Sequence, residues 1–133
     1  MARKSKLQKK KDNQYSIYWR TRADKEVTKY YTGLPCAICG TTYNTCGHHI
    51  APRDVPRFRH DPDNLIPLCE KHHKWGNEIA PHSPNALAQR AFTNWIEENL
   101  PKSFEILETY MRYKGVKSDY REAYEEWAEI NNE

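Results

Sequence analysis

Apolar side chains recur at helical spacing along the C-terminal part of the chain. A first predicted helix is capped at Ser83, with Pro84 in its first turn, and has this apolar face: Leu87, Ala91, Phe92, Trp95, Ile96 and Leu100. Pro101 starts a break, and a second helix ending near Gly115 has its own: Phe104, Leu107, Tyr110 and Met111. A third helix, capped by Ser118 or Asp119, turns glutamates outward and these residues inward: Tyr120, Ala123, Tyr124, Trp127 and Ile130. Because each helix has one apolar face, we expect residues 83–133 to form a helical extension packed on the rest of the chain.

The N-terminal part divides into a polar arm and an aromatic segment. Residues 1–14 are rich in lysine and contain almost nothing to bury, which predicts a flexible basic arm. From Tyr15 to Tyr31 aromatic residues interleave with basic ones, and the spacing favours a helix. The run Ile17–Trp19 suits a strand equally well, so both types of element stay open. Residues 32–35, Thr-Gly-Leu-Pro, then end the element.

The middle of the chain predicts short elements. In order they are a tight turn at residues 36–40 in which Gly40 takes a positive φ, a strand at 48–50, an irregular loop at 51–63, a returning strand at 64–68, and a helix from Cys69 to about Trp75 or Ile79. We therefore expect an α+β fold in which residues 15–82 form the core.

The composition describes one small and very polar domain. Of its 133 residues 38% are hydrophobic and 29% are charged, and the mean hydropathy is -1.02. So modest a core favours a structural metal ion as a cross-link. No apolar run approaches ~18 residues, and no hydrophobic segment follows the basic N-terminus, so we expect no membrane span, no signal peptide and a cytoplasmic location. In a reducing compartment the four cysteines are better explained as metal ligands than as disulfides.

The net charge of +3 conceals a gradient along the chain. Residues 1–35 hold ten Lys/Arg against three Asp/Glu, residues 36–75 hold five against four, and residues 76–133 hold six against eleven. A basic N-terminal end predicts contact with a polyanion such as DNA. The basic side chains proposed for that contact are Lys9, Lys10, Lys11, Arg20 and Arg22. The alternative is a tail that only keeps the protein in solution.

Two short-spaced pairs of residues predict a structural zinc site. Zinc prefers four tetrahedral Cys or His ligands, commonly delivered as two such pairs. Cys36 and Cys39 form one pair, and Cys69 and His72 form the other. A more compact site that uses Cys46 with Cys36 and Cys39 is the alternative; otherwise Cys46 is expected to be a small buried residue.

The same window resembles a known family. Cys-x2-Cys, then His48-His49-Ile50, then Asn64-Leu-x2-Leu-Cys69-x2-His72-His73 is similar to the zinc-stapled branch of the HNH endonucleases, which have the ββα-metal fold. The resemblance covers residues 36–75. The chain departs from the paired zinc knuckles of the family in one respect: His72 stands where a second cysteine is usual, and an imidazole still permits zinc.

The resemblance implies a role for each matched residue. His49 would be the general base, which suits an imidazole near neutral pH. His48 and His73 would bind a catalytic divalent cation such as Mg²⁺ or Mn²⁺, and Asn64 would brace the loop that orients His49. Between them lie three arginines that could contact DNA phosphates: Arg53, Arg57 and Arg59. The resemblance therefore implies a metal-dependent DNA endonuclease, and its small size suits a bacteriophage protein acting in the host cytoplasm.

Two other classes of function stay open. A zinc-stabilised nucleic-acid-binding module without catalysis would also explain the cysteines and the charge gradient. A phage recombination or packaging protein could instead bind a partner, or a second copy, through the acidic C-terminal helix. His60 and His82 are expected to be surface histidines, and the cut site, the physiological ion and the oligomeric state are not specified by these patterns.

Overall fold

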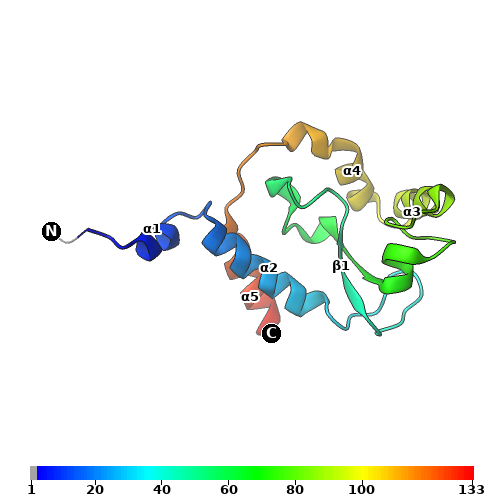
Figure 1. Cartoon of the computed structure of the whole chain (residues 1–133), viewed down its shortest axis with the longest axis horizontal. Coiled ribbons are helices and arrows are strands. Elements are labelled where there is room, and N and C mark those ends of the chain that lie inside the picture. The colour runs from blue at the N-terminus through cyan, green and yellow to red at the C-terminus, as the bar shows by residue number, and fades with distance from the viewer. Residues whose placement is uncertain (1–2) are drawn as a thin grey trace.

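A two-stranded antiparallel hairpin lies at the centre of the computed structural model, which describes residues 3–133 (Figure 1). Strand β1, Thr45–His49, pairs with β2, Leu65–Cys69, so that Thr45 lies opposite Cys69 and His49 opposite Leu65. Nearly all of β2 is buried, whereas β1 alternates buried and more exposed positions. The fold is α+β, as the sequence predicts, and β1 carries both members of the His48-His49 pair.

The segment between the strands covers one end of the hairpin. It contains two short 3₁₀ turns, Pro56–Phe58 and Pro62–Asn64, within an otherwise irregular path. Ala51, Val55 and Phe58 form a small buried cluster with Ile106. This segment, residues 51–63, is hereafter called the β1–β2 loop.

The aromatic segment near the N-terminus is a helix, which resolves the choice between helix and strand. Helix α2, Ile17–Tyr31, buries Ala23, Val27 and Tyr31, which are spaced four apart and therefore share one face. Gly47 of β1 lies close to this helix, because a Cβ atom there would be 3.2 Å from the Tyr31 ring. The helix thus forms a wall beside the hairpin.

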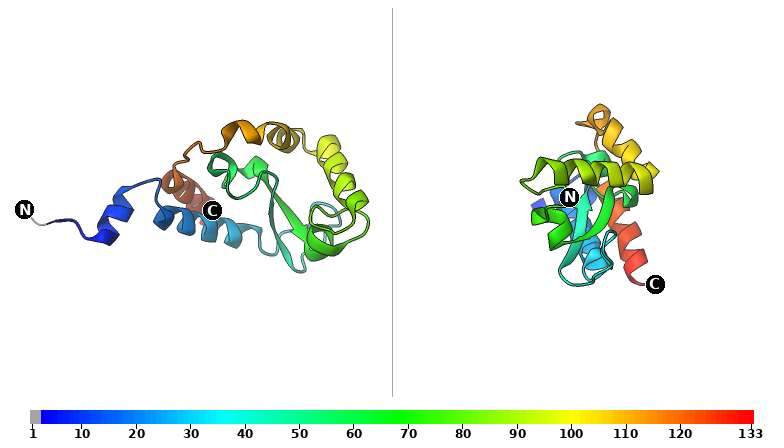
Figure 2. Two further views of the ribbon diagram at one scale, coloured as in Figure 1. Left: turned by 45° about the horizontal axis from the view of Figure 1, so that its top comes forward. Right: turned by 90° about the vertical axis from the view of Figure 1, so that its right-hand side faces the viewer.

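The C-terminal helix α5, Tyr120–Asn131, lies alongside α2 (Figures 1 and 2). Asp119 caps it by accepting a hydrogen bond from the Glu122 amide at 2.9 Å, as predicted. Trp127 is buried against Val27 and Tyr31. The apolar face of α5 is therefore used within the chain, while its glutamates stay exposed; contact with a partner through them remains a prediction.

Helices α3, Ala86–Asn99, and α4, Pro101–Thr109, cover the other side of the hairpin (Figure 1). Phe92 and Ile96 pack with Ile66 and Leu68 of β2 in the largest buried cluster. The helical extension over residues 83–133 is thereby present, with differences in detail. The cap of α3 is Asn85, whose side chain accepts from the Leu87 amide at 2.9 Å, and not Ser83.

Two residues assigned to apolar helix faces are exposed. Leu87 is 69% exposed because it occupies the first turn of α3, which projects beyond the hairpin. Met111 is 60% exposed because α4 gives way to a 3₁₀ turn, Tyr110–Tyr113, that changes the direction of its side chains. Neither residue contributes to the core.

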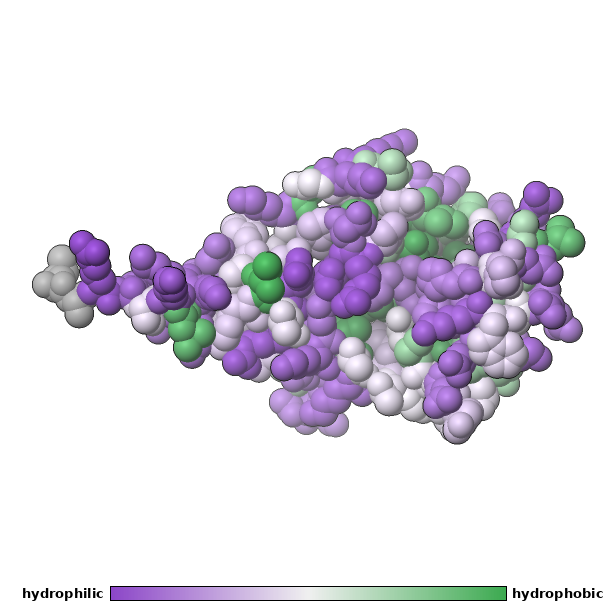
Figure 3. All heavy atoms as spheres, in the orientation of Figure 1, coloured by the Kyte–Doolittle hydropathy of each residue, from purple (hydrophilic) through white to green (hydrophobic). Residues whose placement is uncertain are grey.

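Part of the N-terminal arm is helical. Residues 6–12 form a short helix, α1, Lys6–Asp12, capped by Ser5 and held to α2 by a hydrogen bond from Trp19 Nε1 to the Lys11 carbonyl at 2.9 Å. Capping by Ser5 and the pairing of Asp12 with Lys4 and Gln8 support this helix. Helix α1 buries none of its residues, and Figure 3 shows this end of the molecule covered mainly by hydrophilic side chains. Residues 1 and 2 of the arm lie outside the described residues.

Among residues 3–133, no helix has the length and apolar character needed to cross a membrane.

Candidate functional site

Four side chains converge into a group that could hold a zinc ion: Cys36, Cys39, Cys69 and His72. Their ligand atoms all lie within 4.8 Å of one another. Cys39 Sγ is 3.7 Å from Cys69 Sγ, and Cys69 Sγ is 3.2 Å from His72 Nδ1. Tetrahedral ligands at a zinc–sulfur distance of ~2.3 Å stand roughly 3.8 Å apart, which these separations approach. The four residues predicted from the sequence are therefore brought together.

The turn that carries Cys36 and Cys39 is built for this geometry. Gly40 has φ +78°, the left-handed conformation that a glycine adopts without strain. Its amide donates to the Cys36 carbonyl at 2.8 Å, and the Ala37 amide donates to the Pro67 carbonyl of β2 at 2.8 Å. Burial raises the pKa of the Cys36 thiol, but backbone amides of Cys39, Cys69 and Ile38 outweigh it and lower that pKa below its usual value. This shift favours the thiolate at Cys36, the form that binds metal.

A second group of potential metal ligands consists of His48, His73 and His82. Their ligand atoms also lie within 4.8 Å of one another. The ring centroids are 5.0 Å apart for His48 and His73, and 4.8 Å apart for His73 and His82. Burial, with the neighbouring His73, lowers the pKa of His48 well below its usual value, so its ring is neutral and can donate a lone pair to a cation.

His82 is exposed, as predicted for a surface histidine, but it also belongs to this group, which the sequence did not predict. Its ring lies against His48 and His73, and its amide donates to the His73 carbonyl at 2.9 Å. The segment that carries His82 is irregular, so no helical or strand period connects it with the other two histidines. Three-dimensional packing alone identifies it as a potential ligand.

A π-helical turn, Lys71–Trp75, separates the adjacent His72 and His73. The Gly76 amide closes this wide turn on the Lys71 carbonyl at 2.7 Å. Neighbouring side chains on a helical turn diverge by roughly 100°, so His72 faces the cysteines while His73 faces His48. The predicted helix after Cys69 is present but ends at Gly76.

His49 lies beside the second group and makes one informative hydrogen bond. Its Nε2 is 3.1 Å from the backbone carbonyl of Arg59. A carbonyl can only accept, so Nε2 carries the proton and Nδ1 keeps a free lone pair. Burial, with the charge of Arg53, lowers the pKa of His49 to about 4. His49 is therefore neutral near pH 7 and able to accept a proton through Nδ1.

Asn64 is fully buried and braces the β1–β2 loop on both sides. Its Oδ1 accepts from the Ala51 amide at 2.6 Å, and its Nδ2 donates to the carbonyls of Phe58 at 2.9 Å and Ala51 at 3.3 Å. These are the loop-bracing contacts that its position in the sequence pattern implies.

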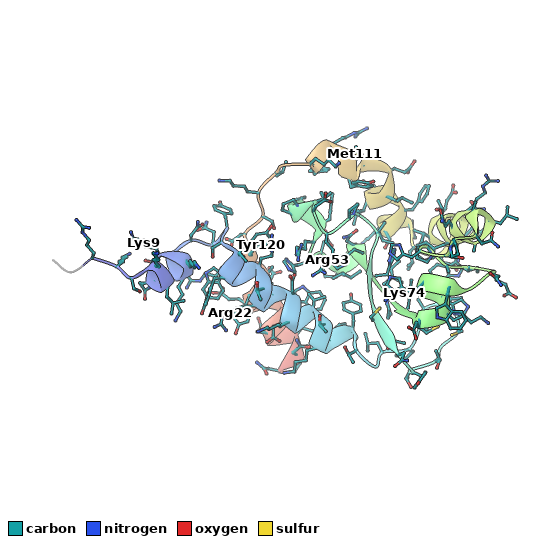
Figure 4. The ribbon with its side chains drawn as sticks, viewed as in Figure 1. Lys9, Arg22, Arg53, Lys74, Met111 and Tyr120 are labelled. Carbon is teal, nitrogen blue, oxygen red and sulfur yellow. The ribbon has the colours of Figure 1, made fainter. Side chains whose placement is uncertain are left out.

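The predicted DNA-binding side chains differ in their accessibility. Arg53, labelled in Figure 4, is exposed and lines the pocket beside the histidines. Arg57 is exposed and lies 3.8 Å from Asp61. The Arg59 side chain is only 11% exposed and is paired with Asp24, so its guanidinium offers little surface to a phosphate.

The more N-terminal basic residues are also mostly accessible. Lys9, Lys10 and Arg22 are exposed, whereas Lys11 and Arg20 are partly buried. The Arg22 guanidinium lies over the Tyr18 ring at 4.4 Å, and Figure 4 shows it on α2.

The histidine group, His49 and Arg53 border one pocket of about 660 Å³ between α2 and the hairpin. One wall comes from α2 and includes Asp24, Val27 and Thr28. The facing wall carries the histidines: His48, His49, His60, His73 and His82. Although adjacent residues of a strand point to opposite faces, both His48 and His49 reach this pocket.

Two further predictions need correction. Cys46 is exposed and not buried, and its Sγ lies 3.5 Å from His73 Nδ1, away from the cysteine group. It is not a member of the Cys36, Cys39, Cys69 and His72 group. His60 is buried and not on the surface, because its Nε2 contacts Asp24 at 2.7 Å beneath α2 and α5. The Asp24 cluster itself was missed, since its members are about 35 residues apart in sequence.

No protein-family profile, curated protein or solved structure matches this chain.

Proposed function

We propose that the protein is a metal-dependent DNA endonuclease of the HNH type. The observation that carries the proposal is the convergence on one pocket of His49, with a free Nδ1 lone pair, and the group His48, His73 and His82. A structural zinc held by Cys36, Cys39, Cys69 and His72 would fix the turn from which His73 projects.

In the proposed reaction His49 acts as the general base. Its Nδ1 takes a proton from a water molecule whose oxygen attacks phosphorus. The new oxygen–phosphorus bond forms as the bond to the 3′ oxygen breaks, and that oxygen takes a proton from solvent. The products are a 5′-phosphate and a 3′-hydroxyl, as the resemblance implies.

His48, His73 and His82 would hold the divalent cation. When bound there, it supplies positive charge next to the phosphate and the leaving oxygen. Cys46 contacts His73 through Nδ1, which leaves Nε2 as the nitrogen free to bind. Imidazole ligands suit Ni²⁺ and Zn²⁺ better than Mg²⁺, which prefers carboxylate and water oxygens. We therefore expect Ni²⁺ to support cleavage at lower concentrations than Mg²⁺ or Mn²⁺.

The basic residues would provide affinity without sequence readout. Arg53 lies in the pocket, and Lys9, Lys10 and Arg22 extend the positive charge along α1 and α2. Contacts of this kind go to phosphates and weaken with salt. Binding should therefore fall steeply with ionic strength for any DNA sequence.

Nicking of supercoiled plasmid tests the proposal. The protein, loaded with one equivalent of zinc and stripped of loosely bound metal, is assayed with Mg²⁺, Mn²⁺ or Ni²⁺ added separately. His49→Ala should abolish cleavage but not DNA binding, whereas Tyr43→Ala, at a side chain that is 77% exposed, should leave both unchanged. Undiminished cleavage by the His49 variant would overturn the mechanism. Binding without cleavage under every ion would instead support the zinc-stabilised binding module.

A further inference from the structure

Asp24, in the middle of α2, makes more polar contacts than a surface carboxylate usually makes. Arg59 donates to it twice, from Nε to Oδ1 at 2.9 Å and from Nη2 to Oδ2 at 2.7 Å. His60 Nε2 lies 2.7 Å from Oδ1, and Arg53 Nη2 lies 3.4 Å from Oδ2. The Asp24 side chain is 23% exposed. Three residues of the β1–β2 loop, Arg53, Arg59 and His60, thus contact one carboxylate of α2.

The carboxylate is held in its charged form. Burial raises its pKa, but hydrogen bonds from His60 and Arg59 outweigh burial and keep the pKa of Asp24 well below its usual value. A bidentate pair with an arginine fixes direction as well as distance, because the guanidinium is planar. The Arg59 side chain therefore has one orientation relative to α2.

The backbone of the same residue meets His49. The Arg59 carbonyl is the group that accepts from His49 Nε2 at 3.1 Å. The next residue is held from a second helix, because Trp127 Nε1 donates to the His60 carbonyl at 2.8 Å. The position of the carbonyl facing His49 is thus determined by α2 through Asp24 and by α5 through Trp127.

We propose that Asp24 is a positioning residue for the general base: by anchoring Arg59 and His60 it holds the Arg59 carbonyl against His49 Nε2. It thereby keeps the proton on Nε2 and the Nδ1 lone pair free toward the pocket. Asp24 touches neither water nor phosphate in this role. The inference rests on the proposed function of His49.

The first test separates positioning from activity. Histidine ¹⁵N NMR of zinc-loaded protein at a pH where His49 is neutral reports which ring nitrogen carries the proton. The wild type should show the Nε2–H tautomer at His49, and Asp24→Asn should show a mixture of both tautomers. An unchanged tautomer in Asp24→Asn would overturn the proposal, whether or not the protein cleaves DNA.

The second test uses steady-state cleavage kinetics. Loss of a group that orients a catalytic imidazole typically costs about 10–100-fold, so Asp24→Asn should lower kcat by that factor while KM for DNA changes less than about twofold. Asp24→Glu keeps the charge and should recover part of kcat. If Asp24→Asn does not fold, Asp24→Glu alone decides: kcat equal to wild type would overturn the proposal, and a reduced kcat with unchanged KM would support it.

Glu26 provides the matched control on the same helix. Its carboxylate accepts from Asn131 Nδ2 of α5 at 2.7 Å, away from the β1–β2 loop. Glu26→Gln keeps an oxygen that can accept this hydrogen bond, and it should leave kcat and the His49 tautomer unchanged. If Glu26→Gln lowers kcat equally, Asp24 merely stabilises α2. Absence of cleavage by the wild type would refute the proposed function while leaving the tautomer test valid.

Discussion

His48 and His49 are adjacent in sequence but are fixed by different neighbours. His48 packs edge-on against Phe92 of α3, at 5.3 Å between ring centroids, and faces His73 and His82. His49 is fixed by the Arg59 carbonyl and faces Arg53. The chemistry of each ring is therefore set by what packs on its side of β1. In the proposed function, His48 provides a metal ligand and His49 a base because different neighbours pack around each ring.

The low pKa of His49 predicts how stability depends on pH. In the unfolded chain its pKa is ~6.5, whereas in the folded protein it is about 4. As pH falls below ~6.5 the unfolded chain binds a proton that folded His49 does not, so the free energy of unfolding decreases toward pH ~4. His49→Gln cannot titrate and should flatten this dependence by at most ~1.4 kcal/mol per pH unit. Urea denaturation with one equivalent of zinc at pH values of about 7.5, 6.5 and 5.5 checks it; parallel curves for the two proteins would contradict the expectation.

Replacing His82 should weaken binding of the proposed catalytic cation without affecting the binding of zinc. His82→Ala deletes one of three imidazoles in the group, so the Ni²⁺ concentration that gives half-maximal cleavage should rise about tenfold or more, equivalent to ~1.4 kcal/mol. Titration calorimetry with Ni²⁺ on the zinc-loaded protein measures the same change in affinity. Release of zinc to a chelator should match wild type, because His82 lies outside the cysteine group. Unchanged Ni²⁺ affinity would show that His82 is not a ligand.

The site could be predicted from the sequence where its residues are joined by short spacings or matched by the family resemblance. Cys36 and Cys39 share a turn, and Cys69 and His72 share another, so their grouping follows from local geometry. His82 and Asp24 carry no such signal. His82 reaches the pocket because an irregular segment folds back on His73, and Asp24 reaches it because α2 packs beside the β1–β2 loop. Both arrangements depend on the tertiary fold.

At the scale of elements, the π-helical turn after β2 connects the two ligand groups. It places His72 and His73 on different sides within successive residues, and it ends where the Gly76 amide meets the Lys71 carbonyl. A π turn is less compact than an α turn and is often found at functional sites. Small changes in this turn should therefore alter the geometry of both ligand groups.

Gly76→Ala should disturb this turn. A Cβ at Gly76 would lie 2.5 Å from the Lys71 carbonyl oxygen, so the turn must shift, at a cost of about 1–3 kcal/mol. Zinc should then be released more readily to a competing chelator, which a colorimetric assay follows. Gly33→Ala is the control: its φ of +82° strains the backbone, but nothing lies within 4 Å, so zinc release should match wild type. Equal zinc retention in both variants would contradict the role of the turn.

The helices themselves followed from the sequence better than their ends did. The apolar period predicted α3, α4 and α5, and Asp119 was recognised as a cap. Asn85, and not the predicted Ser83, caps α3 because its side chain accepts a hydrogen bond from the Leu87 amide. The type of α2 could not be assigned, since its aromatic residues suit either element and only packing against α5 selects the helix.

At the scale of the whole molecule, packing of α2 against α5 brings the N-terminal and C-terminal parts of the chain together. Asn131 of α5 donates to the Glu26 carbonyl at 2.9 Å across 105 positions of sequence. Trp127 is the centre of this contact, with its ring 5.2 Å from that of Tyr30 and its indole N–H on the His60 carbonyl. Trp127 therefore joins the two helices to the β1–β2 loop.

Trp127→Ala should lower the free energy of unfolding by about 3–5 kcal/mol, the usual cost of removing a buried large aromatic side chain. Trp127→Phe keeps a ring but leaves the His60 carbonyl without its donor, and should cost about 1–3 kcal/mol. Urea denaturation of both variants, with Tyr43→Ala as an exposed aromatic control, measures the differences. A loss below about 1 kcal/mol in Trp127→Ala would argue against the packing of α5 on α2.

The distance in sequence between α2 and α5 also sets an order of events during protein synthesis. By the time the ribosome has added His82, every residue of both ligand groups exists, and zinc can already cross-link residues 36–72. Val27 and Tyr31 nevertheless remain uncovered until Trp127 is translated. Until then the nascent chain presents an apolar helix face, the kind of surface that chaperones bind, and the carbonyl of His60 has not yet received its donor. A newly made chain can thus complete the group of Cys36, Cys39, Cys69 and His72 before Trp127 anchors the β1–β2 loop.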